Sequence, residues 1–206
     1  MIVGDYTFNN NTSMKLERRT NKIAKVLEQR QPDLTVVMEN IHDPHNVSAM
    51  LRSADAVGIH EVNLIYTAAR YPKIGSKSSS SANKWISRRK FPSVAECYDR
   101  LHHEGFQILA TRLDDQSRQL YEFDLTKPTA FVFGNEHAGV TDDAAHLADA
   151  TVYIPMMGMI QSLNVSVACA VTIYEALRQR MNKGYYSDPR FEKNILEKLK
   201  EEWMRK

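Results

Sequence analysis

Short apolar runs alternate along most of this chain with longer segments whose apolar residues recur every three or four positions. The short runs have the length and the β-branched content of buried strands. Five of them stand out: 34–40, 61–66, 106–111, 130–136 and 150–156. The longer segments have the periodicity of amphipathic helices. Strands that alternate with helices in this way predict an α/β fold, with a mostly parallel sheet and flanking helices.

Helical spacing predicts six helices: 14–30, 44–58, 93–105, 142–148, 163–182 and one in the tail from residue 188. In the second of these, Asn46 is the expected N-cap, because an Asn side chain accepts the free amide hydrogens of a first helical turn. Gly58 is its expected end, because glycine adopts the left-handed conformation that follows a last turn. Residues 75–90, rich in serine and lysine, are predicted to form a loop, and residues 1–13 a frayed terminus.

Ligands of parallel sheets bind beyond the carboxyl ends of the strands. Four polar segments follow predicted strands here: 39–46, 110–115, 133–139 and 156–164. Neither the G-x-G-x-x-G motif nor the P-loop motif occurs, which argues against a dinucleotide-binding enzyme and a P-loop nucleotide hydrolase. The histidines lack metal-ligand spacing, so no metal is expected. The methionines of the last segment are either soft apolar walls for a ligand or ordinary core residues.

Charge is unevenly distributed, although the formal net charge is only +2. No acidic residue lies between Glu61 and Glu96, where seven basic residues occur, and the segments 14–30 and 178–206 are also rich in positive charge. These segments form either a basic face for a polyanion such as nucleic acid or an ordinary solvated surface.

The compartment can be inferred from absent signals and from the cysteines. No basic, apolar leader and no apolar run long enough to span a bilayer occur, so no membrane partner is expected. Cys97 and Cys169 are far apart and belong to no paired motif, which indicates neither a disulfide framework nor a zinc site. A reducing, cytoplasmic setting is therefore expected.

Three segments carry a specific pattern: "VVMENIHDPHNVSAMLRSADAVGIHEVNLIY" at 36–66, "FVFGNEHAGVTDDA" at 131–144 and "IPMMGMIQSLNVSVACAVTIYEALRQR" at 154–180. In this order and spacing they resemble the three motifs of the SPOUT class of RNA methyltransferases. Within that class they are most similar to the enzymes that methylate the ribose of guanosine 18 in the D-loop of tRNA. The resemblance covers residues 31–180.

The resemblance implies a SPOUT α/β-knot fold, in which the C-terminal segment passes through a loop as a deep trefoil knot, and it implies a homodimer. It divides the chain into an N-terminal basic helical extension (1–30), the methyltransferase domain (31–183) and a C-terminal helical extension (184–206). The implied cofactor is S-adenosylmethionine, held largely by main-chain contacts. By motif matching, these contacts fall at Thr111, Gly134, Ile154, Met159 and Leu163.

Carried over position by position, the resemblance assigns catalysis to Arg52, Asn46, Glu136, Ser162 and Asn164. Arg52 would orient a phosphate and stabilise negative charge on the attacking ribose oxygen, since a guanidinium stays protonated. Glu136 would anchor the motif loops or pair with an arginine, and Ser162 and Asn164 would arrange the substrate at the start of the last long helix. The structural alternatives are an ion pair between Arg52 and Asp55 and a capping role for Ser162.

The function implied by the resemblance is S-adenosylmethionine-dependent 2′-O-methylation of guanosine 18 in tRNA. Basic side chains would hold the RNA phosphates: Arg18, Arg19, Lys22, Lys25, Lys84, Arg88 and Arg89. Two alternatives stay open. One is a 2′-O-methyltransferase of ribosomal RNA, and the other is a catalytically silent RNA-binding dimer of the same fold.

Overall fold

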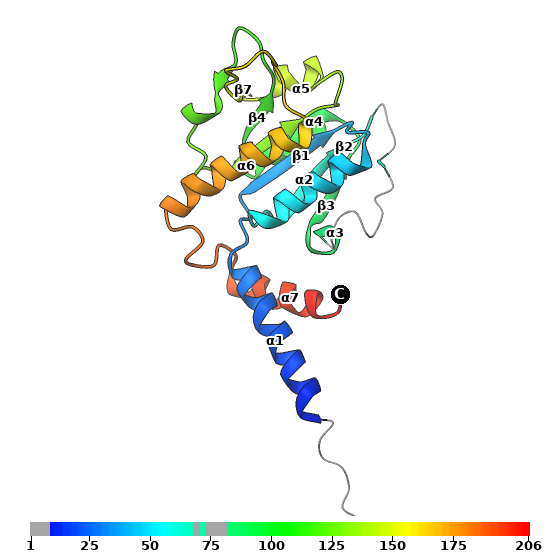
Figure 1. The fold of residues 1–206 in the computed structure, drawn as a ribbon, viewed down its shortest axis with the longest axis vertical. Coiled ribbons are helices and arrows are strands. Elements are labelled where there is room, and N and C mark those ends of the chain that lie inside the picture. The colour runs from blue at the N-terminus through cyan, green and yellow to red at the C-terminus, as the bar shows by residue number, and fades with distance from the viewer. Residues whose placement is uncertain (1–8, 68–70, 73–81) are drawn as a thin grey trace, which may run out of the picture.

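The computed structural model describes residues 9–67, 71–72 and 82–206 and shows one parallel sheet between layers of helices (Figure 1). The sheet order is β3-β2-β1-β6-β4-β7-β5, and all pairings between these strands are parallel. The strands are β1 (Leu34–Glu39), β2 (Glu61–Ile65), β3 (Ser87–Phe91), β4 (Gln107–Thr111), β5 (Arg118–Gln119), β6 (Thr129–Phe133) and β7 (Ala150–Tyr153). The predicted α/β class with a mostly parallel sheet is confirmed.

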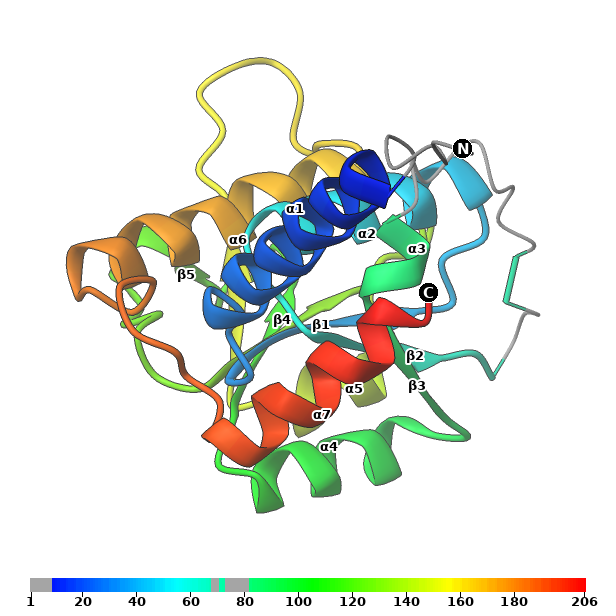
Figure 2. The same ribbon diagram turned by 90° about the horizontal axis from the view of Figure 1, so that it is seen from below.

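The helices are α1 (Asn9–Glu28), α2 (Pro44–Ala56), α3 (Ala82–Trp85), α4 (Val94–His103), α5 (Asp142–Leu147), α6 (Val165–Asn182) and α7 (Lys193–Met204), with a 3-10 turn at Leu120–Glu122. Helices α2 and α6 cover one face of the sheet, and α4 and α5 cover the other. Helices α1 and α7 pack against each other beyond the sheet (Figures 1 and 2). All six predicted helices are present, but the first begins at Asn9, within the segment predicted to be frayed.

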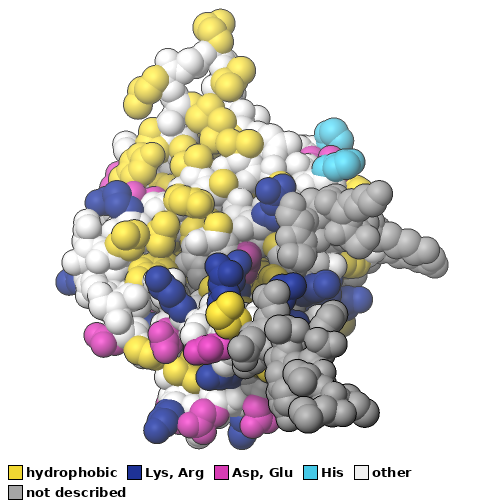
Figure 3. Space-filling model, turned by 60° about the horizontal axis from the view of Figure 1, so that its bottom comes forward, with side chains coloured by type: hydrophobic (Ala, Val, Ile, Leu, Met, Phe, Trp, Pro, Cys, Tyr) yellow, Lys and Arg dark blue, Asp and Glu magenta, His cyan; other side chains and the backbone are white. Residues whose placement is uncertain are grey.

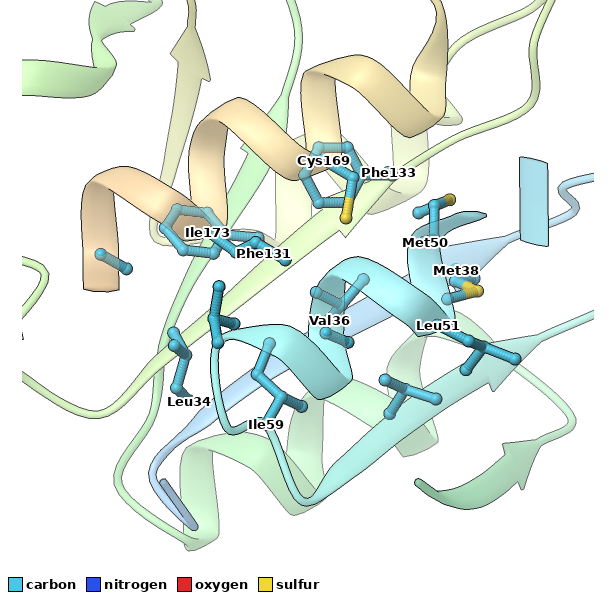
Figure 4. Packing of buried hydrophobic residues seen from close by; sticks show 14 of the residues in the cluster. Leu34, Val36, Met38, Met50, Leu51, Ile59, Phe131, Phe133, Cys169 and Ile173 are labelled. Atoms are coloured by element: carbon cyan, nitrogen blue, oxygen red, sulfur yellow. The ribbon is translucent and has the colours of Figure 1, made fainter. Parts of the chain in front are cut away.

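Alternation along the central strands builds the two cores. In β6, Phe131 and Phe133 pack with α2 and α6, whereas Val132 packs with α4 and α5. Successive strand residues point to opposite faces, so a fully buried strand serves both cores at once. Figure 4 shows Cys169 and Ile173 of α6 in the first core, close to the aromatic rings of β6. This packing fixes the start of α6 beside the start of α2, where the candidate site lies.

Three local predictions are corrected by the structure. Helix α3 and most of β3 lie within the segment 75–90 that was predicted to be a loop; residues 75–81 of that segment lie outside the described residues. β5, only two residues long, was also not predicted. The N-cap of α2 is Asp43, not Asn46, because an Asp43 carboxylate oxygen accepts the His45 amide at 2.8 Å. Pro44 suits the first helical position, since it has no amide hydrogen to leave unpaired.

The two terminal helices share a small core of their own. Ile23 and Leu27 of α1 and Trp203 of α7 are buried together, and the ring of Trp85 in α3 packs against them. Through Trp85 this cluster is continuous with the main domain. The predicted domain boundaries at residues 30 and 183 stay a prediction.

Candidate active site

A cavity of about 710 Å³ lies at the carboxyl edge of the sheet, where β4, β6 and β7 end. Thr111 ends β4, Gly134 follows β6 and Ile154 follows β7, and all three line the cavity. Residues of the segment between β7 and α6 form a further wall, and this segment stands out from the body of the molecule (Figure 2). Three of the four polar segments predicted to form a site therefore meet at one cavity. The fourth, 39–46, adjoins it.

A chain of side-chain hydrogen bonds joins the three motif segments. Asn46 Nδ2 donates to Glu136 Oε1 at 3.0 Å, and Asn164 Nδ2 donates to Asn46 Oδ1 at 3.1 Å. The amides of His42 and Asp43 donate to the two carboxylate oxygens of Glu136 at 3.1 and 3.0 Å. Glu136 therefore anchors the motif loops, as one of its two predicted roles requires. Within the described part of the chain it pairs with no arginine.

The charge of Glu136 determines which groups donate and which accept in this series of hydrogen bonds. Burial by itself raises the pKa of the Glu136 carboxyl group, but hydrogen bonds from the Asn46 amide and from backbone amides outweigh it, and the pKa is lowered. The ionised carboxylate can only accept hydrogen bonds. Asn46 must therefore turn its NH₂ group to Glu136 and its carbonyl oxygen to Asn164. The network holds the loops in one arrangement, and no proton transfer is needed for this role.

Asn164 also begins α6. Its Oδ1 accepts from the Ser166 amide at 2.9 Å and from the Ser166 hydroxyl at 2.6 Å, so Asn164 is the N-cap. The structural alternative in which Ser162 caps this helix is wrong. Ser162 lies two residues earlier, exposed and on the wall of the cavity, where its hydroxyl is available to a ligand.

Gly134 is held where no side chain fits. A Cβ atom at this position would lie 2.0 Å from the carbonyl oxygen of Gly139 and 2.1 Å from the nitrogen of Val140. The turn between them is closed by Asn135, whose Oδ1 accepts from the amides of His137 and Ala138 at 2.9 and 3.1 Å. Glycine is needed here because two stretches of backbone touch.

Four of the five predicted cofactor positions line the cavity: Thr111, Gly134, Ile154 and Leu163. The Thr111 hydroxyl donates to the Val132 carbonyl at 2.8 Å, which ties β4 to β6 at the edge of the cavity. Met159 is fully exposed and does not line the cavity, whereas Met156 and Gly158 do. The roles of these residues in binding stay a prediction.

Arg52 lies outside the cavity. It is exposed on α2 and, among the described residues, takes part in no hydrogen bond or ion pair. The structural alternative, an ion pair with Asp55, is wrong: Asp55 instead pairs with the buried guanidinium of Arg30. The Arg52 guanidinium is therefore available to a molecule that binds from outside.

Sequence reasoning missed two residues of the site. Arg112 lines the cavity and is held by Asp114 at 3.3 Å and by Asp142 at 2.7 Å. Asn135 closes the turn after Gly134. The placement of Asn135 two residues before the amide it binds is typical of an Asx turn, a signal that could have identified it. No comparable local signal exists for Arg112.

The predicted RNA-binding residues lie away from the cavity. On α1 they are exposed: Arg18, Arg19, Lys22 and Lys25. Lys84 is exposed on α3, and Arg88 and Arg89 are exposed on the edge strand β3. The predicted RNA-binding residues therefore lie on α1, α3 and β3, apart from the cavity that four of the predicted cofactor positions line.

Across residues 9–67, 71–72 and 82–206, no three His, Cys, Asp or Glu side chains are grouped so that they could hold a metal ion. No helix of these residues combines the length and the apolar character that a membrane crossing requires.

Comparison with known proteins gives concordant matches. The model of the SpoU rRNA Methylase family matches residues 33–174. A tRNA (guanosine(18)-2′-O)-methyltransferase of Thermus thermophilus is 44% identical over 192 residues, which are 93% of this chain and 98% of the relative. Its namesake from Escherichia coli is 46% identical over 168 residues, 82% of this chain and 73% of the relative. The crystal structure of the A. aeolicus TrmH/SpoU tRNA modifying enzyme superimposes with a TM-score of 0.87 at 39% identity, covering 93% of this chain and 97% of that one.

Proposed function

Because this chain belongs to the SpoU rRNA methylase family, we propose that it transfers the methyl group of S-adenosylmethionine to the ribose 2′-hydroxyl of guanosine 18 in tRNA. The observation that carries the proposal is the 44% identity with an enzyme of that name over 93% of this chain. A relative named for 23S rRNA is 34% identical over 78% of this chain, so the tRNA substrate is favoured over the ribosomal one.

The residues around the cavity fit this cofactor. A volume of about 710 Å³ suits a ligand of this size. Ile154 and Leu163 supply apolar walls, and the backbone around Gly134 can approach a ligand closely because no side chain stands in the way. A related methyltransferase, AviRb from Streptomyces viridochromogenes, has been solved with AdoMet; it is 31% identical with a TM-score of 0.65, and the match covers 75% of this chain and 59% of that one.

The protein's part in the reaction is positioning and charge stabilisation. Bound S-adenosylmethionine supplies a methyl group on a sulfonium that is itself a good leaving group. The hydrogen bonds that join Glu136, Asn46 and Asn164 hold the three motif segments in fixed positions relative to one another. The ribose oxygen can therefore be kept in line with the methyl group. Arg52, exposed on α2, orients a substrate phosphate and stabilises charge on the oxygen. The phosphate or water accepts the proton.

The proposal is tested by incubating a tRNA transcript with the protein and isotopically labelled S-adenosylmethionine, followed by nuclease digestion and mass spectrometry. We expect one labelled 2′-O-methylguanosine, at position 18. A matched transcript with 2′-deoxyguanosine at that position lacks the accepting hydroxyl and should take up no label. Label in 23S rRNA but not in tRNA would favour the ribosomal alternative, and no label in either RNA would favour the catalytically silent one.

Gly134→Ala is expected to weaken binding of S-adenosylmethionine by roughly 5- to 150-fold, the equivalent of the ~1–3 kcal/mol that overpacking costs. The new methyl group would force the backbone at residues 139 and 140 away and distort the wall of the cavity. Isothermal titration calorimetry measures the change. Gly158→Ala is the matched control, because Gly158 lines the same cavity but has open space around its Cβ position. Equal affinities of the two variants would contradict the role of Gly134.

We propose further that two copies of the chain pair through α6. Val167, Tyr174 and Met181 are 47%, 49% and 60% exposed and recur every seventh residue, so they form one stripe along the helix. Figure 3 shows exposed hydrophobic side chains gathered on one face of the molecule. A monomer rarely leaves such a stripe in water, and a second copy offers a self-complementary cover.

Tyr174→Glu should shift the protein from dimer to monomer in sedimentation velocity, because a charge would enter an apolar interface. Leu147→Glu is the control: Leu147 is equally exposed, at 49%, but lies on α5 at the other face of the sheet. A wild-type monomer, or a Tyr174→Glu dimer, would contradict the proposed interface.

The resemblance of the three motif segments to the SPOUT methyltransferases supports two further proposals. We infer that the segment from β6 to α6 forms the trefoil knot of this family, and tracing the chain in an experimental electron-density map tests it. We also infer that the protein acts in the cytoplasm, where tRNA is available and where its two buried cysteines stay reduced. Fractionation of cells followed by immunodetection tests the second inference.

A further inference from the structure

A second cavity, of about 610 Å³, lies between α1, α3 and the end of α7, away from the first. Its walls are basic and aromatic. Arg19 and Lys22 of α1, Lys84 of α3 and Lys206 at the end of the chain bring four cations to it. Lysine and arginine side chains gather on this side of the molecule (Figure 3). We call this cavity the basic tryptophan pocket.

The aromatic walls are the rings of Trp85 and Trp203. Their centroids are 4.9 Å apart with the planes inclined at 47°. Trp203 is 3% exposed and lies close to two cations, with the Arg30 guanidinium 5.1 Å and the Lys206 ammonium 5.7 Å from its ring. Trp85 is only half-buried, so part of its surface faces the pocket. A flat aromatic surface beside several cations is the arrangement on which a nucleobase stacks.

The positive charge of the side chains that line the pocket is not balanced by acidic side chains of its described lining. Asp55 is the one acidic residue among its described lining, and it is already paired with Arg30. Lys206 is paired with Glu202 at 2.8 Å, whereas Arg19, Lys22 and Lys84 have no ion pair within the described ranges. A bound anion would supply the missing negative charge.

Arg30 gives independent evidence for a ligand. It is fully buried yet lines the pocket, and its Nε is a buried donor without a partner in the described structure. Its other nitrogens donate to the Ile59 carbonyl at 2.6 Å and to Asp55. Burial lowers the pKa of the Arg30 guanidinium, and Asp55 offsets only part of that effect. Buried donors in native proteins are nearly always satisfied, so a phosphate in the pocket would complete this site.

We propose that the basic tryptophan pocket binds one unpaired nucleotide of the tRNA substrate, with its phosphate between Lys22, Lys84 and Arg30 and its base against Trp85. The inference rests on the proposed function, because it assigns a second contact site to the same RNA. Helix α2 links the two sites: Asp55 in the pocket lies nine residues from Asn46, a rise of about 14 Å along the helix. One RNA strand can span that distance, and Arg52 is exposed on the helix between its ends.

Tryptophan fluorescence tests the proposal directly, because the chain has two tryptophans and both line this pocket. We expect a tRNA transcript to quench the emission of the wild-type protein, over the same concentration range in which a filter-binding assay shows the transcript bound to the protein. S-adenosylmethionine alone should leave the emission unchanged. Inorganic phosphate should compete only weakly with the transcript for the pocket. A nucleoside 5′-monophosphate, which also carries a base, should quench the tryptophan emission. A transcript that binds without altering the emission would overturn the proposal.

Two variants separate stacking from charge. Trp85→Leu keeps an apolar side chain in the cluster but removes the stacking surface, and tRNA affinity should fall roughly 5- to 100-fold. Lys22→Glu should weaken tRNA binding and reduce its dependence on salt. The control is Lys198→Glu, the same charge change at an exposed position of α7 outside the pocket. Wild-type affinity in both pocket variants would also overturn the proposal.

Failure of this inference differs from failure of the proposed function. Suppose that the wild-type protein methylates tRNA, but that bound tRNA leaves its emission unchanged and both pocket variants bind tRNA with wild-type affinity. Only the proposed role of the pocket is then refuted. If the wild-type protein methylates no RNA, the proposed function is refuted. Calorimetric titration of each variant with S-adenosylmethionine reports whether the main domain is folded, and the wild-type fluorescence result stands whether or not Trp85→Leu folds.

Discussion

Replacing Arg180 with methionine should lower the free energy of unfolding by about 3–5 kcal/mol, the loss typical when one partner of a buried ion pair is removed. Arg180 lies in the last turn of α6 and is fully buried. Its guanidinium donates to Asp33 Oδ1 at 2.6 Å and to the carbonyl oxygens of Leu125 and Lys127 at 3.0 and 2.8 Å. Methionine fills much of the space but donates no hydrogen bond. The Leu125 carbonyl then loses the hydrogen bond from Arg180, and the Lys127 carbonyl and the Asp33 carboxylate keep only their bonds from Thr129 and Arg190 among the described residues.

The effect should be large because Arg180 connects segments that are distant in sequence. Asp33, which Arg180 contacts, precedes β1 and also pairs with Arg190 in the tail at 2.5 Å. Gln31 donates from its amide to the Tyr185 carbonyl at 3.0 Å and accepts from Arg180 at 3.2 Å. The start of the sheet, the end of α6 and the lead-in to α7 are therefore held at one point. Loss of the guanidinium loosens all three.

Urea unfolding followed by circular dichroism, at one protein concentration, measures the loss as a lower midpoint at unchanged slope. Arg178→Met is the matched control. Arg178 lies on the same helix and is 61% exposed, and its ion pair among the described residues is with Glu175 one turn away. Because Gln179 also donates to Glu175, at 2.9 Å, replacing Arg178 should change stability by no more than about 1 kcal/mol. Similar midpoints for the two variants would show that Arg180 does not hold these segments together.

The fold was predictable where burial gives the sequence a regular pattern of apolar residues. It was not predictable where an element is charged or very short, because the pattern is then absent. β1 and β6 are buried at every position, β2 and β4 at most positions, and β7 at Val152. β3 was missed because its three central residues, Arg88, Arg89 and Lys90, are all charged and exposed. It is an edge strand, and charged side chains on an edge prevent pairing with other chains. β5 is too short to produce any pattern. The N-cap of α2 was misplaced because Asp43 and Asn46 are both good caps, and Pro44 decides between them.

The candidate site was predictable as a set of segments but not as a geometry. Polar segments after parallel strands had to meet at one edge of the sheet, and the cavity is there. The bonds from Asn46 to Glu136 and from Asn164 to Asn46 could not be derived, because they depend on β1 lying next to β6 and on α6 packing beside α2. The basic tryptophan pocket was out of reach for the same reason: its walls come from both ends of the chain, and nothing in the sequence pairs Trp85 with Trp203.

Arg52→Ala should lower the rate of methyl transfer by about 100- to 1,000-fold, the range found when one group that stabilises a developing oxyanion is removed. Binding of S-adenosylmethionine should stay within about twofold of the wild type, since Arg52 does not line the cavity and makes no hydrogen bond or ion pair among the described residues. Single-turnover incorporation of labelled methyl groups measures the rate, and calorimetry measures the affinity. Arg118→Ala is the control, an arginine 55% exposed at the far edge of the sheet.

Arg52→Lys distinguishes a planar clamp from a general base. A guanidinium holds a phosphate through two parallel hydrogen bonds, which a compact ammonium cannot reproduce, so a clamp predicts that lysine restores little activity at any pH. A base at this position predicts instead that the lysine variant gains rate as the pH rises towards about 10, where its amine loses a proton. A flat pH profile with low activity therefore supports charge stabilisation by Arg52. Recovery at high pH would assign proton removal to this position, and near wild-type turnover in Arg52→Ala would exclude it from the reaction.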